Sequence, residues 1–104
     1  AEQAAGAFDG ARAAWKEAGR EGEPRLVVIN YFALGDVELG RANAHHYYEM
    51  FGDYADAVAK GVNGSADDLN ATTKAFQDLG VDELIYIPTT DDVDDVARLA
   101  DIVL

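Results

Sequence analysis

The sequence predicts an α/β fold in which parallel strands are covered by helices, on the basis of three observations. Two short apolar runs, residues 26–34 and 84–87, show almost no polar alternation, which is typical of strands in a parallel sheet that is covered on both faces. Between them, apolar residues recur at three- and four-residue steps, as in helices. The last of these helices ends at a glycine directly before the second run, so this part of the chain reads as half of a β-α-β unit.

Length and composition exclude several classes of function. The 104 residues suffice for one domain, and their net charge of −12 argues against nucleic-acid and anionic-membrane partners, which such a surface repels. No apolar run approaches the roughly 20 residues of a membrane span, and nothing resembles a signal peptide. The absence of cysteine removes disulfides and thiolate metal sites, so we expect a cytoplasmic protein.

The chain opens with an alanine-rich segment, residues 1–18, that predicts an amphipathic helix. Phe8, Ala11 and Trp15 share one side of it, and Gly19 ends it before a polar turn. Trp15 is either a packing residue or a surface for stacking a ligand.

The clearest strand is residues 26–34, which is rich in β-branched and aromatic residues and broken only by Asn30. A buried amide needs hydrogen-bond partners. Asn30 is therefore either satisfied inside a core or facing a polar cavity.

A single long helix is predicted over residues 37–60, with an apolar face that includes Leu39, Met50 and Tyr54. His45 and His46 are adjacent and point about 100° apart on a helix, so they do not form a chelating pair and we expect no metal site. Tyr47 and Tyr48 are core-edge residues, interface residues or the wall of a pocket.

The next helix has clear signals at both ends. Ser65 is placed to cap it, and Gly80 is suited to the left-handed conformation that closes it. Its predicted apolar face is formed by Leu69, Thr72, Phe76 and Leu79.

A final helix is predicted after the second strand. Thr89 or Thr90 is expected to cap it, with Asp91 and Asp92 in its first turn. Its predicted apolar face is formed by Val93, Val96, Ala97, Ala100 and Val103, widened by Leu99 and Ile102.

Two strands that are each buried on both faces cannot complete a sheet, because their outer edges keep unpaired N–H and C=O groups. We therefore expect either a piece of a larger α/β protein or a chain that completes its sheet by self-association, as a homo-oligomer.

Several segments together resemble the C-terminal end of luciferase-like monooxygenases, over nearly the whole chain. They are Gly19-Arg20, Pro24-Arg25, the Tyr-Phe-Ala-Leu-Gly run at 31–35, Tyr47-Tyr48, the Gly-Val-Asp-Glu-Leu-Ile-Tyr-Ile-Pro-Thr run at 80–89, and the Asp-rich segment 91–101. The resemblance implies that residues 1–104 are the C-terminal part of one TIM-barrel domain, with its seventh and eighth strands. Such a barrel needs about 250 residues.

The resemblance also implies an enzyme that uses reduced flavin (FMN) or the deazaflavin coenzyme on a small organic substrate, and that commonly forms dimers. TIM-barrel chemistry lies at the carboxyl ends of the strands. The candidates for a substrate pocket are therefore Asn30, Tyr31, Tyr47, Tyr48, Thr89 and Thr90.

The loops after the two strands carry aspartate and glutamate but neither lysine nor arginine, so they do not suit a flavin phosphate. We expect the cofactor phosphate to be held elsewhere in a full-length protein and the isolated chain to bind no cofactor and to be inactive. No catalytic residue is apparent. The alternative function is a non-catalytic acidic α/β module that associates through its apolar helix faces.

Overall fold

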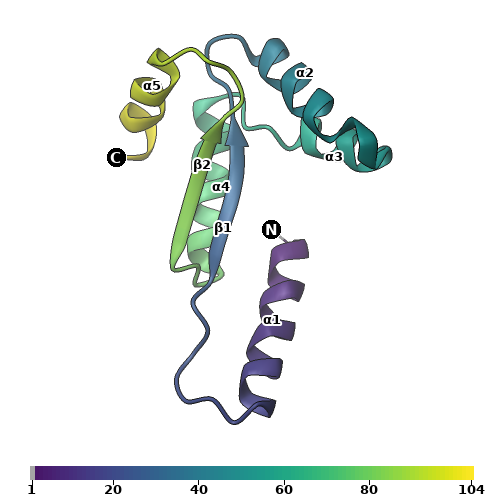
Figure 1. Cartoon of the computed structure of the whole chain (residues 1–104). Coiled ribbons are helices and arrows are strands. Elements are labelled where there is room, and N and C mark those ends of the chain that lie inside the picture. Colours follow the sequence, from purple (N-terminus) through teal and green to yellow (C-terminus); the bar gives the residue numbers. More distant parts are fainter. Residues whose placement is uncertain (1) are drawn as a thin grey trace.

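The computed structural model describes residues 2–104 and contains a parallel sheet of two strands, β1 (Val27–Phe32) and β2 (Glu83–Pro88) (Figure 1). The register pairs Val27 with Glu83 and ends at Phe32 with Pro88. The other elements, in chain order, are α1 (Glu2–Glu17), α2 (Val37–Tyr48), the 3-10 helix η1 (Glu49–Phe51), α3 (Asp53–Lys60), α4 (Ala66–Asp78) and α5 (Asp94–Val103). The predicted mixed α/β class with parallel strands and intervening helices is confirmed.

One face of the sheet is covered by α4, which lies behind both strands in Figure 1. The Tyr86 hydroxyl lies 2.8 Å from Thr73 Oγ1 and donates to the carbonyl of Leu69, so the second strand is tied to α4 by polar as well as apolar contacts. Phe32 and Leu69 are fully buried in this layer. The predicted ends of α4 are confirmed: Ser65 Oγ accepts from Asp68 N, and Gly80 has a φ of 77°.

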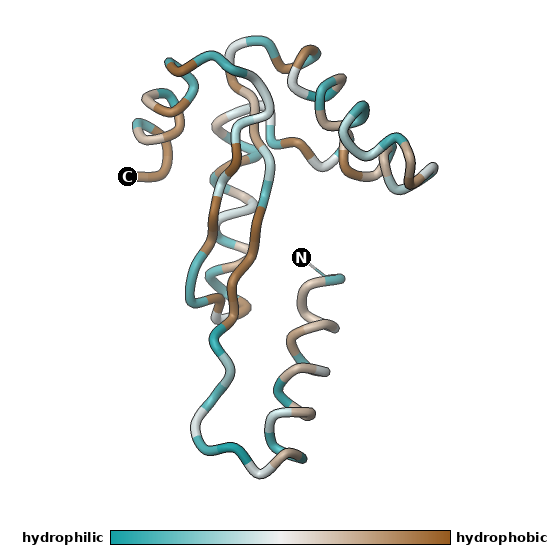
Figure 2. Tube along the Cα trace, in the orientation of Figure 1, coloured by the Kyte–Doolittle hydropathy of each residue, from teal (hydrophilic) through white to brown (hydrophobic). Residues whose placement is uncertain are grey.

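The other face of the sheet is uncovered in residues 2–104, although hydrophobic residues follow one another along both strands (Figure 2). Ile29 is 55% exposed, Val27 43% and Ile85 37%. The expectation that both faces are covered is therefore wrong for this part of the chain. A continuous apolar run predicts that both faces of the strand are covered. It does not predict that residues 2–104 provide the covering layer on both sides.

The predicted single helix over residues 37–60 is also wrong. It is two helices, α2 and α3, which meet at η1 and fold back on each other (Figure 1). Gly52 lies at the reversal with φ 63° and ψ −125°, a conformation that side chains with a Cβ rarely adopt. His45 Nε2 lies 2.8 Å from Asp56 Oδ1 and joins the two helices.

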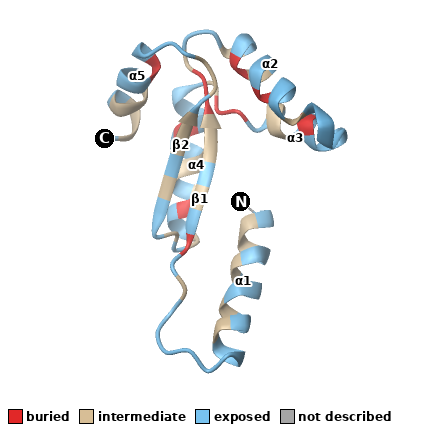
Figure 3. Ribbon diagram, viewed as in Figure 1, coloured by how far each residue is buried: buried red, intermediate tan, exposed pale blue. Residues whose placement is uncertain are grey.

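The small apolar core lies at the carboxyl end of β1, where it meets α2 and the segment before α4 (Figure 3). Ala33, Ala44 and Val62 are buried there. Asn63 pairs with the outer edge of β1: its N–H donates to Tyr31 O and its C=O accepts from Ala33 N. Its side chain donates to Tyr31 O and accepts from Thr72 Oγ1, so both polar atoms of this buried amide are hydrogen-bonded.

The predicted helix at the start of the chain is confirmed as α1, with Ala1 outside the described residues. None of its described residues is buried (Figure 3). Trp15 packs against its own loop, donating to Glu21 O with the Arg20 guanidinium 3.8 Å above its ring. Across residues 2–104, no helix combines the length and the apolar composition that a membrane crossing requires.

Candidate functional site

A cleft of about 810 Å³ opens at the carboxyl ends of the two strands, between α2 and the loop that joins β2 to α5. Its lining combines apolar, tyrosyl and small polar side chains with a single carboxylate. The lining residues are Tyr31, Leu39, Asn43, Ala44, Tyr47, Tyr48, Ile87, Pro88, Thr89, Thr90 and Asp91.

Helix α2 forms one wall, and a glycine sets how closely it approaches the sheet. A Cβ on Gly40 would lie 2.4 Å from Ala33 Cβ and 2.5 Å from Thr89 Oγ1, so only glycine fits here without a shift. Three residues further on, Asn43 Nδ2 donates to Thr89 O over 2.9 Å. These two contacts fix the width of the cleft at its strand end.

Four tyrosines and a phenylalanine form an aromatic cluster with Tyr48 in its centre, and three of them, Tyr31, Tyr47 and Tyr48, line the cleft. The Tyr48 ring lies 5.1 Å from Tyr47, 5.5 Å from Tyr54, 6.1 Å from Tyr31 and 6.2 Å from Phe51. The Tyr31 and Tyr48 hydroxyl oxygens are 2.5 Å apart and share a hydrogen bond. Tyr31 comes from β1 and Tyr48 from α2, so this bond joins the strand to the helix.

The hydrogen bond to Tyr48, together with partial burial and the neighbouring tyrosines, raises the pKa of Tyr31 to about 12. Each cause disfavours the tyrosinate: the bond holds the proton, and the apolar surroundings do not solvate a charge. Tyr31 is therefore a neutral hydrogen-bonding group at physiological pH and is not suited to act as a general base.

The opposite wall is the loop after β2, and its threonines do not cap α5 as predicted. Thr89 Oγ1 donates to Phe32 O, and Thr90 Oγ1 accepts from Asp92 N within the loop. The helix begins later, at Asp94, and Val93 before it makes no side-chain cap. Thr89 instead fastens the loop to the end of β1, and Thr90 donates to Asp95 in α5.

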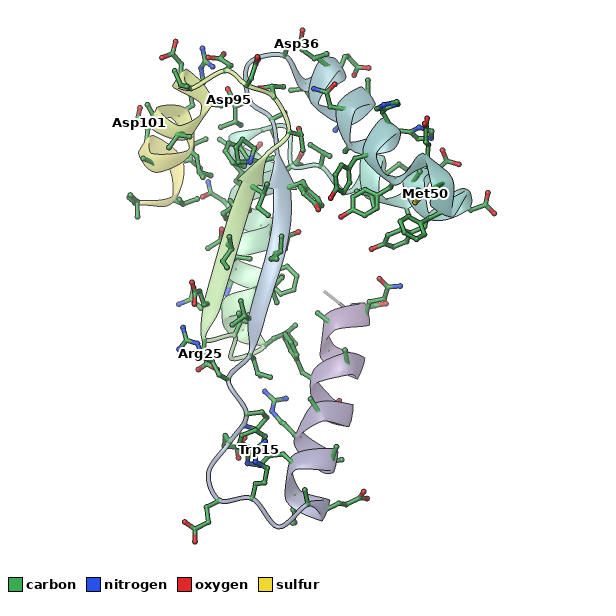
Figure 4. The ribbon with its side chains drawn as sticks, in the orientation of Figure 1. Trp15, Arg25, Asp36, Met50, Asp95 and Asp101 are labelled. Carbon is green, nitrogen blue, oxygen red and sulfur yellow. The ribbon has the colours of Figure 1, made fainter. Side chains whose placement is uncertain are left out.

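Asp95 is fully buried between α5 and the carboxyl end of the sheet, where it binds the loop after β1 and also accepts from Thr90 Oγ1 in the loop after β2 (Figure 4). Its carboxylate accepts from Gly35 N at 2.9 Å, Leu34 N at 3.2 Å and Arg98 Nη1 at 2.7 Å. Burial raises the pKa of Asp95, but the bonds from Arg98 and the two backbone N–H groups outweigh burial and hold its pKa below the ordinary value.

Because Asp95 points inward, the packed face of α5 differs from the predicted one. Val93 and Val96 are exposed, whereas Leu99 and Ile102, four and seven residues after Asp95, are half-buried. The prediction is therefore wrong for Val93, Val96 and Ala97, which are exposed, whereas Ala100 and Val103 are half-buried as Leu99 and Ile102 are.

Five of the six predicted pocket residues line this one cleft: Tyr31, Tyr47, Tyr48, Thr89 and Thr90. The sixth, Asn30, does not line it. Side chains alternate along a strand, so Asn30 lies on the α4 face with Phe32. The sequence analysis did not identify Asn43 or Asp95. Asn43 could have been found, because it lies four residues before Tyr47 and therefore on the same face of the helix.

The cleft suits neither a phosphate nor a metal ion. No lysine, arginine or histidine lines it, and Asp36 already occupies the N-terminus of α2 by accepting from Leu39 N. Among residues 2–104, no three His, Cys, Asp or Glu side chains are arranged to hold a metal ion. Neutral polar groups and aromatic rings therefore dominate its chemistry.

Comparison with known proteins does not identify the chain. No protein-family model matches it, and neither does any curated protein or solved structure.

Proposed function

We propose that this chain forms the last two strands of a luciferase-like (β/α)8 barrel and that its cleft is one wall of the substrate pocket of a flavin- or deazaflavin-dependent oxidoreductase. One observation carries the proposal. The cleft lies at the carboxyl ends of two parallel strands, the end at which TIM-barrel enzymes carry out their chemistry.

The uncovered sheet face supports the barrel assignment. Barrel strands pack one face under helices and turn the other toward a core filled by branched side chains. Here the α4 side is covered, and the register places Ile29 beside Ile85 and Tyr31 beside Ile87 on the other side. This apolar surface has the composition of a barrel interior.

The chemistry of the cleft fits a cofactor enzyme in which other parts of the protein hold the flavin. A flavin or deazaflavin supplies the redox chemistry itself, so the protein needs few acids or bases. The residues of this chain would orient the substrate: Tyr31 and Tyr48 offer neutral hydroxyls, and Asn43 fixes the loop that carries Thr89.

A second candidate function, non-catalytic association, is favoured by the amount of exposed surface. The chain exposes 6958 Å², whereas a compact monomer of this mass exposes about 5,700 Å². Its radius of gyration, 15.5 Å, also exceeds the roughly 13 Å of a compact domain. Both values fit a chain that packs against further polypeptide.

Cofactor titration of the natural gene product tests the proposed function. We expect it to bind reduced FMN or deazaflavin, and we expect Tyr31→Ala and Thr89→Ala to lower substrate turnover more than cofactor affinity. Residues 1–104 alone should show no saturable binding by flavin fluorescence. A gene product that binds neither cofactor but self-associates would contradict the enzyme proposal and support the association function.

A further inference from the structure

We propose that the cleft binds a small organic cation, an ammonium or quaternary ammonium group carried on an apolar body. This inference names the substrate class of the same pocket, and it rests on the proposed function in treating the cleft as a substrate site. Three features of the cleft carry it: the arrangement of its tyrosine rings, its charge and its apolar floor.

The rings of Tyr31, Tyr47 and Tyr48 form a corner inside the cleft. Tyr31 meets Tyr48 at an interplanar angle of 69°, and Tyr47 meets Tyr48 at 74°. Both pairs are edge contacts between neighbouring rings, and all three side chains line the cleft, so an occupant meets tyrosine rings in more than one orientation. Tyrosine rings attract quaternary ammonium groups by cation–π interaction.

The corner is rigid on one side and open on the other. The shared hydrogen bond between the Tyr31 and Tyr48 hydroxyls holds these two rings in place. Tyr47, in contrast, is 77% exposed although it lines the cleft. An occupant would cover its ring and remove that apolar surface from water.

The charge of the cleft selects against anions. Asp91 is its only charged lining residue, and no ion pair involving Asp91 occurs within residues 2–104. The basic residues close to the lining in sequence each have a carboxylate partner. Arg98 binds Asp92 and Asp95, and Arg41 lies 3.7 Å from Glu38. His45 lies 2.8 Å from Asp56 and His46 3.3 Å from Glu49. A cation therefore meets an available carboxylate and no competing positive charge.

The remaining wall is apolar and sets the shape of the ligand. Leu39, Ala44, Ile87 and Pro88 line it. The volume of about 810 Å³ falls in the range of small-molecule sites, roughly 300–1,000 Å³. The chemistry thus fits a ligand with a cationic head at the tyrosines and a hydrocarbon body on the aliphatic side chains.

An NMR titration of the ¹⁵N-labelled chain tests the inference with two probes. Choline carries a quaternary ammonium group, and 3,3-dimethylbutan-1-ol has the same shape with carbon in place of the charged nitrogen. We expect choline to shift the amide signals of residues 43–48 and 89–91 saturably, and the neutral alcohol to bind at least tenfold more weakly. Equal affinities for the two probes, or no shifts with choline, would overturn the proposal.

Variants at exposed positions keep the fold intact while testing each contact. Tyr47→Leu and Asp91→Asn should each weaken choline binding about two- to fivefold, as expected for partly exposed cation–π and charge contacts. Asp94→Asn removes the same charge outside the cleft and should change affinity by less than half as much. If Asp94→Asn weakened choline binding as much as Asp91→Asn does, the effect would come from the overall negative charge of the chain, and this result would contradict the proposed site.

The outcome is separable from the proposed function. Cofactor titration of the natural gene product reports on the flavin assignment, and the two-probe comparison reports on the cation. Selective choline binding without flavin binding would support the cation site and remove the enzyme proposal. Flavin binding with no preference between the two probes would support the enzyme proposal and remove the cation site.

Discussion

The carboxylate of Asp95 accepts the backbone N–H of Gly35 over 2.9 Å, linking the start of α5 to the loop that follows β1. The same carboxylate binds Leu34 N and Arg98, so one buried side chain joins both loops at the carboxyl end of the sheet. These loops carry one wall of the cleft and lead into the helix that forms the other. The geometry of the cleft therefore depends on a residue that does not line it.

Replacing Asp95 with asparagine should lower the free energy of unfolding by about 2 kcal/mol, because the N–H groups of Leu34 and Gly35 lose a charged acceptor, while Arg98 keeps Asp92. Urea denaturation at pH 7 measures the change. Asp101→Asn removes the same charge at an exposed position of α5 and should change stability by no more than about 0.5 kcal/mol. A loss of similar size in both variants would contradict the anchoring role.

Asp95 also predicts the acid limit of stability. Its pKa is lower in the folded chain than in the unfolded chain, so its contribution is complete above the unfolded pKa, near 3.9. The contribution is lost as the pH falls through the lower, folded pKa. Thermal unfolding at successive pH values should show a steeper fall below about pH 4 in the native chain than in Asp95→Asn. Parallel curves would be inconsistent with a lowered pKa.

The bond between Tyr31 and Tyr48 predicts a late tyrosine ionisation. With the pKa of Tyr31 raised to about 12, its contribution to stability is complete below pH 10 and is lost as the pH rises toward 12. Absorbance at 295 nm should show one of the five tyrosines ionising near pH 12. Tyr31→Phe should remove this step, and Tyr48→Phe should move it toward pH 10. A late step that survives in Tyr31→Phe would belong to another residue.

The close approach at Gly40 predicts a large effect from one methyl group. Gly40→Ala should destabilise the chain by about 1–3 kcal/mol, since its Cβ would overlap Ala33 and Thr89. The matched control is Gly10→Ala in α1, where a Cβ meets nothing within 4 Å and alanine should favour the helix by about 0.5–1 kcal/mol. Denaturant unfolding of both variants, with helix content measured by circular dichroism, separates the effect of steric overlap at residue 40 from the effect of helix propensity.

The uncovered face of the sheet predicts self-association of the 104-residue chain. Sedimentation at micromolar concentration should show a dimer or a larger species, because exposed apolar strands and open edges favour pairing. Ile29→Lys places a charge on that face and should shift the chain toward monomer. Val96→Lys, on the exposed side of α5, serves as the control and should leave the assembly unchanged. A stable monomer at these concentrations would refute this expectation.

The sequence by itself determined the features that depend on neighbouring residues. The Ser65 cap, the Gly80 stop and both strands were predictable because capping, left-handed glycine and apolar runs are local signals. Most of the cleft was also predictable. Parallel strands place their carboxyl ends at one edge of a sheet, so Tyr31 and Thr89 had to lie near each other once the strands were identified.

The tertiary structure alone decided the features that depend on distant partners. The helical pattern continues past Gly52, and only the packing of α3 back on α2 shows that the chain reverses there. Asp95 looks like any acidic residue of an Asp-rich segment. Its partners include the backbone N–H groups of Leu34 and Gly35, which every residue other than proline possesses and no sequence pattern marks. Which acid is buried was therefore decided by the fold, because only the folded chain brings those donors to α5.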